Sequence, residues 1–382
     1  MPKSAPALIE PALLIWGRKV ARLTVEDAAK KTHVKAEQLE AWERGKGHPT
    51  VKQLRALAHV YQQSFAAFYL PVPPLEEVAV PPDRRRLPSD QLEQLSPAAA
   101  LDLRTAWEHR EIVLELLRDQ GQTPIAVEAV ASTDENPESV GEKVRKVLRI
   151  SYEVQKEWRD KRVAFNAWRD AAGEAGVLVF QATDVPVAEL RGYSISVDPL
   201  PVVVVNRKDS YAGRSFTLLH EMTHILLRSG GLCDLEGEQA IEIFCNHAAG
   251  AALVPSGSLL KEQTVLAHGE SPEWEDEEIE ILAQTYSVSE EVLVRRLLTL
   301  RLTTKTFYEK KRRQYLDEFA RLPKKKGFVS PAVDAVSALG KPYVRLVLDA
   351  FRSLKLTAND VADYLGVRLK HLDAVGHAVE GE

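Results

Sequence analysis

A histidine pair with an adjacent glutamate, His220, Glu221 and His224, stands within residues 216–227. This run is apolar on much of its surface and contains no Gly or Pro, which predicts a helix. Histidines four residues apart share one face of a helix, so both imidazoles can bind the same metal ion. Glu221 can then contact a water in the open coordination position and act as a general base in hydrolysis. The alternative is an ordinary helix on which both histidines are only packed or solvated.

A catalytic metal site of this kind needs a third protein ligand, and the next predicted helix offers Glu238, Glu242, Cys245 and His247. Residues 242–255 are apolar and rich in small residues, so this helix should pack closely on another and direct Glu242 inward. We therefore select Glu242. Cys245 lies one turn away on the same face and would also suit zinc, although a buried cysteine is common in cores. His247 points off this face and is not an expected ligand.

The remaining pattern predicts a mainly helical chain with one small sheet, an α+β fold. Short runs rich in β-branched residues predict strands at 177–180 and 202–205, with a third candidate at 193–197. Helical periodicity covers residues at about 97–120, 138–148, 153–173, 211–229, 236–253, 274–286, 289–299, 304–320 and 340–375. Gly173 and Gly176 are expected to close the helix before the first strand. No internal repeat of the solenoid type is visible.

The N-terminal segment differs in charge from the rest. Residues 11–70 hold ten Lys/Arg and five Asp/Glu, a net charge of +5 in a chain whose total is −5. Such asymmetry is typical of a nucleic-acid module attached to another domain. The segment reads as five short helices, one of them preceded by a capping-box pattern that starts at Thr24.

These residues resemble the Xre/Cro-type helix-turn-helix family, through Leu23 to Ala29, Val34 to Leu39, Trp42 to Gly45, and Pro49-Thr50. The resemblance implies a recognition helix at about 35–44, with Leu39 and Trp42 inward, that enters a major groove. The residues expected to face double-stranded DNA are Lys35, Gln38, Arg44 and Lys46. Lys35 and Glu26 depart from residues that are common in the family, so a module used for protein contact or dimerisation is the alternative.

Residues from about 190 to 300 resemble the ImmA/IrrE family of metallopeptidases. The resemblance rests on Arg191 to Ile195, Pro201 to Asn206, Arg214 to His224, the order Glu242, Asn246, Pro255, and the pair Arg296-Leu297. It implies that His220, His224 and Glu242 hold the metal and that Glu221 is the base. The family usually has a bulky aromatic residue where Ala248 stands and an acidic one where Ala251 stands, so the helix that carries Glu242 is expected to pack differently.

The predicted organisation follows from these segments. We expect an all-α helix-turn-helix domain at 1–70, a Pro-rich linker at 71–90, a zincin-like HExxH metallopeptidase domain at 91–322, and a helical extension at 323–382. The Lys-rich run at 324–326 suggests a hinge before the extension. Within the extension, Thr357 starts a second capping-box pattern and Gly366 is a plausible helix stop. The extension either binds a partner or completes the core.

The composition of the chain indicates the cellular compartment in which this chemistry is expected. No window is apolar enough to span a bilayer, the start of the chain lacks a signal-peptide core, and there are only two cysteines, so we expect a cytoplasmic protein without membrane contact. The cofactor is expected to be Zn²⁺, with Mn²⁺ as the alternative. The resemblance implies a metal-dependent endopeptidase that cleaves a protein such as a repressor.

A binding function is the alternative: a DNA-binding autoregulator or an antitoxin that neutralises a neighbouring toxin, with the metal site secondary or vestigial. A homodimer is compatible with either function.

Overall fold

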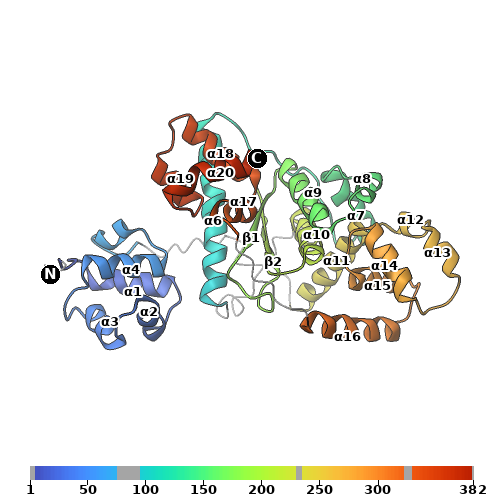
Figure 1. Cartoon of the computed structure of the whole chain (residues 1–382), viewed down its shortest axis with the longest axis horizontal. Coiled ribbons are helices and arrows are strands. Elements are labelled where there is room, and N and C mark those ends of the chain that lie inside the picture. The colour runs from blue at the N-terminus through green and yellow to red at the C-terminus, as the bar shows by residue number, and fades with distance from the viewer. Residues whose placement is uncertain (1–4, 75–94, 229–234, 322–328, 381–382) are drawn as a thin grey trace. The chain divides into compact units, whose positions relative to one another are not determined.

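The computed structural model describes residues 5–74, 95–228, 235–321 and 329–380, and it divides into two compact units, residues 1–107 and residues 108–382 (Figure 1). The predicted linker lies outside the described residues except at 71–74, and the predicted hinge at 324–326 lies outside them entirely. None of the described helices is long and apolar enough to cross a membrane.

The first unit contains the five short helices that the sequence predicts, the last of them a 3-10 helix. They are α1 (Pro11–Val20), α2 (Val25–Thr32), α3 (Ala36–Glu43), α4 (Val51–Tyr61) and η1 (Phe65–Tyr69). Thr24 caps α2 by accepting a hydrogen bond from the Asp27 amide at 3.0 Å. Their apolar faces enclose one core, whose largest members include Leu13, Leu39 and Trp42. Helix α6 (Pro97–Asp119) begins in this unit and ends in the second.

The second unit is built on a three-stranded mixed sheet. Its strands are β1 (Leu178–Ala182), β2 (Gly192–Ile195) and β3 (Val202–Asn206), in the order β1-β3-β2. β3 runs parallel to β1 and antiparallel to β2, which places Val203 between Val179 and Ser194. Every residue of β3 is buried, as expected for a central strand covered on both faces. The three predicted strands are therefore confirmed.

Helices surround this sheet (Figure 1). Helix α10 packs on β2 and β3, α9 packs on β1 and on α10, and α17 packs on β1. The helices of this unit after α6 are α7 (Pro137–Val147), α8 (Tyr152–Lys156), α9 (Lys161–Glu174), α10 (Tyr211–Leu227), α11 (Leu235–Leu253), α12 (Ser256–Leu259), α13 (Gln263–His268), α14 (Asp276–Thr285), α15 (Glu290–Thr299), α16 (Lys305–Arg321), α17 (Pro331–Leu339), α18 (Lys341–Arg352), α19 (Ala358–Tyr364), η2 (Leu369–His371) and α20 (Leu372–Glu380). The predicted class, mainly α with a small sheet, is confirmed.

Two details of the helix prediction were wrong. The predicted helix at 153–173 is interrupted, because the Asp160 carboxylate accepts hydrogen bonds from the Arg162 and Val163 amides and starts α9 as a separate helix. Gly173 lies inside α9, and only Gly176, at φ +87°, follows its end. The predicted helical segment at 340–375 is helical and contains several helices, and α17 precedes it.

The C-terminal helices are joined to the sheet by a buried guanidinium. Arg169 of α9 donates to the carbonyl of Val179 in β1 at 3.1 and 2.7 Å, and to the carbonyls of Ser337 and Ala338 in α17 at 2.7 and 3.1 Å. Burial lowers the pKa of Arg169 to about 10, so the group is still charged at neutral pH. The segment 331–380 thus contributes to the core of the second unit.

His109 of α6 is packed between Phe180 of β1 and Tyr343 of α18, and its Nδ1 lies 3.0 Å from the Tyr343 hydroxyl. Burial lowers the pKa of His109 to about 4. Between pH 6.5 and 4 the unfolded chain therefore binds a proton at this histidine that the folded chain does not, and stability falls as the pH falls.

We predict that His109 lowers the free energy of unfolding of the second unit by about 3 kcal/mol between pH 6.5 and pH 4. His109→Gln, which keeps a hydrogen-bonding group but does not titrate, should lose this part of the pH dependence. Urea unfolding at a series of pH values measures it. Parallel curves for the two proteins over this range would contradict the assignment.

Candidate metal centre and DNA-binding face

Helix α10 carries the histidine pair and the adjacent glutamate. It starts at Ser210, whose hydroxyl accepts a hydrogen bond from the Gly213 amide at 3.1 Å, and it ends at Arg228 in a left-handed conformation. Leu219, Met222 and Leu226 are fully buried against the core. This burial fixes the rotation of the helix about its axis, so His220 and His224 are presented together on its opposite side.

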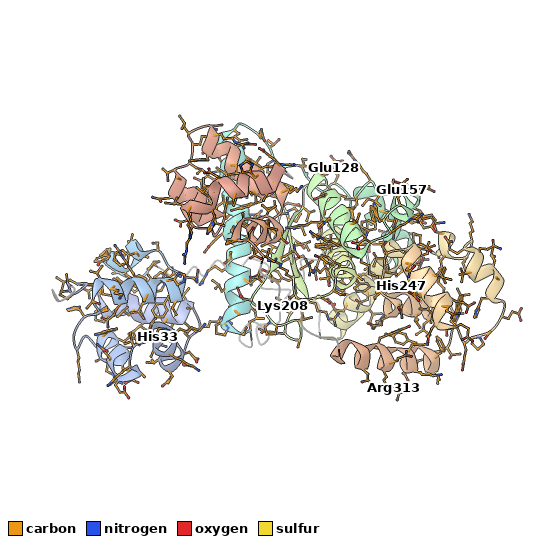
Figure 2. All side chains as sticks on the ribbon, in the orientation of Figure 1. His33, Glu128, Glu157, Lys208, His247 and Arg313 are labelled. Atoms are coloured by element: carbon orange, nitrogen blue, oxygen red, sulfur yellow. The ribbon has the colours of Figure 1, made fainter. Side chains whose placement is uncertain are left out.

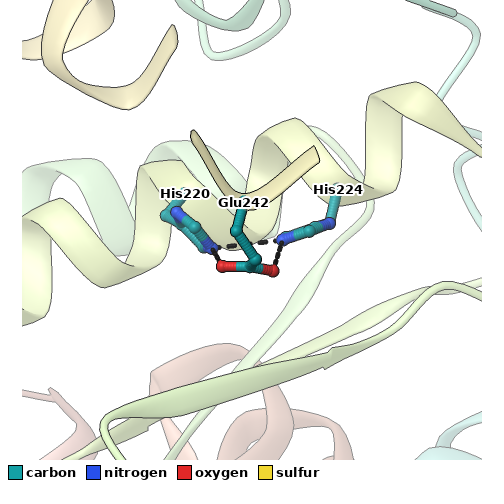
Figure 3. Close-up of side chains that lie close together, drawn as sticks. All are labelled: His220, His224 and Glu242. Carbon is teal, nitrogen blue, oxygen red and sulfur yellow. Dashed lines mark hydrogen bonds and ion pairs between the residues drawn. The ribbon is translucent and has the colours of Figure 1, made fainter. Parts of the chain in front are cut away.

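His220, His224 and Glu242 converge on one point, as Figure 3 shows. The two Nε2 atoms are 3.1 Å apart. The Glu242 carboxylate spans them, with Oε2 at 3.2 Å from His220 Nε2 and Oε1 at 3.1 Å from His224 Nε2. Among the residues that the structure describes, this is the one group of His, Cys, Asp and Glu side chains found with a spacing that could hold a metal ion.

The donor spacing fits a divalent ion. Nitrogen and oxygen ligands at about 2.0–2.1 Å from a tetrahedral Zn²⁺ lie roughly 3.3–3.4 Å apart, close to the separations seen here. Two neutral imidazoles and one carboxylate are a donor set that zinc accepts, and three protein ligands leave one position for water. The residues present therefore fit a catalytic metal ion rather than a closed structural site.

The three side chains are also electrostatically coupled. Burial lowers the pKa of His220, but its hydrogen bond to Glu242, the charges of Glu221 and Glu242, and its interaction as a donor with Asn246 together raise it above the ordinary value. Hydrogen bonds from His220 and His224 hold the pKa of Glu242 well below its usual range in spite of its partial burial. The carboxylate is therefore ionised and ready to bind a cation.

Glu221 lies next to His220 on α10, and its carboxylate contacts a different element, β2. Its side chain is nearly buried, and one carboxylate oxygen accepts a hydrogen bond from the Ser194 hydroxyl of β2 at 2.8 Å. A carboxylate held in this way next to two candidate ligands is placed to act as a base. Sequence reasoning missed Ser194. A polar residue inside a short strand was the available signal, but which helix that strand packs against could not be read from the sequence.

The other candidates for the third ligand, Cys245 and His247, make different contacts. Cys245 is fully buried, and its sulfur lies 3.7 Å from Nδ1 of His224, on the ring edge away from Glu242. His247, labelled in Figure 2, pairs instead with Glu138 of α7 at 2.9 Å. The side chain of Glu238 lies outside the described residues. Of the three candidates whose side chains the structure describes, Glu242 is the one that contacts the Nε2 atoms of both histidines.

Helix α11 is held in place by unusually close packing on α7. A Cβ atom built on Gly141 of α7 would lie 2.8 Å from the Ala248 carbonyl oxygen, the Ala251 Cβ and the Ala252 amide nitrogen of α11. Small residues on both helices are required for this approach.

Buried side chains bind the carbonyl groups at the C-terminal end of α11. Arg145 of α7 donates to the Ala252 carbonyl at 2.7 Å, and Gln155 donates to the Leu253 carbonyl at 2.8 Å. Arg296 of α15 donates to the Val254 carbonyl at 2.7 Å and forms a bidentate pair with Glu138. These bonds satisfy groups that a helix end leaves unpaired, and cations suit the negative end of the helix dipole.

The predicted DNA-facing residues lie in and around α3 of the first unit. Lys35, Gln38, Arg44 and Lys46 are all exposed, whereas Leu39 and Trp42 are buried, as the sequence predicts. Arg44 pairs with Glu40 at 2.7 Å on the surface of α3. The acidic Glu43 is neutralised by Arg18, with two hydrogen bonds at 2.7 and 2.8 Å.

The fold and the two sites define a metallopeptidase-like domain that follows a helix-turn-helix domain. Comparison with known families agrees: residues 172–298 match the IrrE N-terminal-like domain, and residues 18–68 match a helix-turn-helix family. No curated protein and no solved structure matches the chain. The chain therefore contains an IrrE N-terminal-like domain together with an N-terminal DNA-binding domain of the helix-turn-helix class.

Gly141→Ala should destabilise the second unit by about 1–3 kcal/mol, because the added methyl group meets backbone atoms of α11. It should also weaken metal binding, since the shift moves Glu242. Gly250→Ala is the matched control on α11, because a Cβ there meets nothing within 4 Å. The control should leave stability unchanged or raise it by up to about 1 kcal/mol. Thermal unfolding and titration with Zn²⁺ measure both effects, and equal behaviour of the two variants would refute close packing as the constraint.

Proposed function

We propose that this chain is a metal-dependent endopeptidase that cleaves a partner protein such as a repressor. The observation that carries the proposal is the convergence of His220, His224 and Glu242 on one point, beside Glu221. In this proposal the first three hold a divalent metal and Glu221 is the general base. Zn²⁺ is the expected ion because imidazole and carboxylate donors suit it, and Mn²⁺ is the alternative.

The chemistry divides between the ion and the chain. A bound divalent ion lowers the pKa of water and polarises a peptide carbonyl group. The Glu221 carboxylate takes the proton of the attacking water and passes it to the nitrogen of the leaving amine. Ser194 binds one oxygen of this carboxylate, which orients the other for proton transfer. His220 and His224, fixed by the buried face of α10, hold their Nε2 atoms in place without rearrangement.

A protein substrate is proposed because the catalytic residues share a chain with a DNA-binding domain, which links the activity to gene regulation. The second candidate is a DNA-binding autoregulator or antitoxin that acts by binding alone. The exposed basic side chains of Lys35, Arg44 and Lys46 favour DNA contact in either case. The two candidates differ in whether the metal site is needed.

Metal content tests the ligand assignment. Glu242→Ala should lose the stoichiometric metal, because two histidines alone leave the ion short of a charged ligand. Cys245→Ala should keep it, since its sulfur contacts the opposite edge of the His224 ring. Elemental analysis of the purified proteins measures both, with circular dichroism to confirm folding. The reverse pattern would move the third ligand to Cys245.

Turnover is tested by separating metal binding from proton transfer. Glu221→Gln should retain the metal and the fold but slow cleavage by about two to four orders of magnitude, because only the base is removed. His220→Ala should lose both metal and cleavage. Each protein is co-expressed with the products of its neighbouring genes, and mass spectrometry reports any shortened product. If Glu221→Gln reproduces every effect of the wild-type protein, proteolysis is not the function and binding replaces it.

A further inference from the structure

The helix-turn-helix in the first unit has a recognisable local signature. Thr24 caps α2, which ends at His33 in a left-handed conformation with φ of 56° (Figure 2). The Val34 amide then donates to the Ala29 carbonyl at 3.0 Å. Lys35 is extended, with ψ of 141°, and starts α3. This sequence of caps makes the tight turn between the two helices.

The same signature occurs in the C-terminal segment, 333 residues later in the chain. Thr357 caps α19, accepting from the Asp360 amide at 3.2 Å, and Gly366 takes the left-handed conformation with φ of 63°. The Val367 amide donates to the Ala362 carbonyl at 2.9 Å, and Arg368 is extended, with ψ of 148°. Residues 23–39 and 356–372 carry the same Leu, Thr, Asp, Ala, Val and Leu at six corresponding positions.

The similarity extends to the preceding helix and to the core. Helix α1 is followed by Arg22 in a left-handed conformation (φ 53°), and α18 is followed by Leu354 in the same conformation (φ 57°). α1 packs against α3, and α18 packs against α20. Where Ala28 is buried in the first unit, its counterpart Val361 is buried in the second. One difference is that the last helix of the C-terminal copy begins with the 3-10 turn η2.

The start of the second helix of this copy is basic, and the acidic Asp373 follows it. Arg368, Leu369 and Lys370 are exposed, and His371 is partly exposed. Neither Arg368 nor Lys370 makes a side-chain hydrogen bond or ion pair within the described residues. Arg368 occupies the position of Lys35, and Lys370 replaces the acidic Glu37 of the first copy. The N-terminal end of the second helix is therefore more positive here than in the N-terminal module.

We propose that residues 341–380 are a second helix-turn-helix unit, which presents Arg368, Lys370 and His371 to double-stranded DNA. Two unpaired cations at the start of a recognition-type helix complement phosphate, and the guanidinium can also bind a guanine edge. A protein interface is less well matched, because lysine is depleted from interface cores. The chain thus carries two DNA contacts, one before and one after the metal centre in sequence.

The test uses the full-length protein with the N-terminal contacts removed by K35A, Q38A, R44A and K46A. In this background the protein should still bind a fluorescent random-sequence duplex at low salt. Adding R368A and K370A should weaken binding on the order of tenfold and reduce the slope of log K against log salt by about 2. R368K should restore part of the binding lost in R368A.

The matched control is K161A with R162A, which removes two exposed charges at the start of α9. This pair should leave affinity and salt slope unchanged. Equal losses in the control and in the R368A/K370A variant would overturn the proposal, since any two charges would then suffice. So would unchanged DNA binding by the R368A/K370A variant, whether or not its association state changes, because the surface would then not be a DNA contact.

Discussion

The candidate metal centre depends on the close contact between α7 and α11. Two of its three donors belong to α10 and are set by the buried face of that helix, but the third, Glu242, is more than half exposed and belongs to a different helix. Its distance from the histidines is therefore decided by the position of α11 as a whole. Gly141 allows α11 to approach α7 at backbone contact, and a larger residue there would displace the carboxylate.

Buried cations complete this arrangement by binding backbone carbonyls. Arg145 and Arg296 hold the C-terminal end of α11, while Arg169 joins β1 to α17. A guanidinium with several donors can satisfy carbonyl groups from two elements at once, which a neutral side chain rarely does. The site thus rests on a framework in which buried guanidinium groups bind backbone carbonyls inside an apolar core, and the C-terminal helices belong to that framework.

Much of this could be predicted from the sequence, because its signals are local. Helical spacing placed His220 and His224 on one face, and β-branched runs predicted the strands. The approach of Glu242 to the histidines followed from a small-residue helix, although its partner, α7, could not be identified. Ser194 and Gly141 were missed because their roles depend on contacts between elements distant in sequence. In the C-terminal segment the sequence predicts a cap at Thr357 and a helix stop at Gly366, whereas the similarity of its turn to that between α2 and α3 depends on the conformation of two folded segments.

X-ray absorption at the zinc edge of the purified, zinc-loaded protein tests the central claim most directly. The account predicts nitrogen and oxygen ligands at about 2.0–2.1 Å, the multiple-scattering pattern of two imidazoles, and no sulfur. A sulfur ligand at about 2.3 Å, or a spectrum with only one imidazole, would contradict a centre formed by His220, His224 and Glu242.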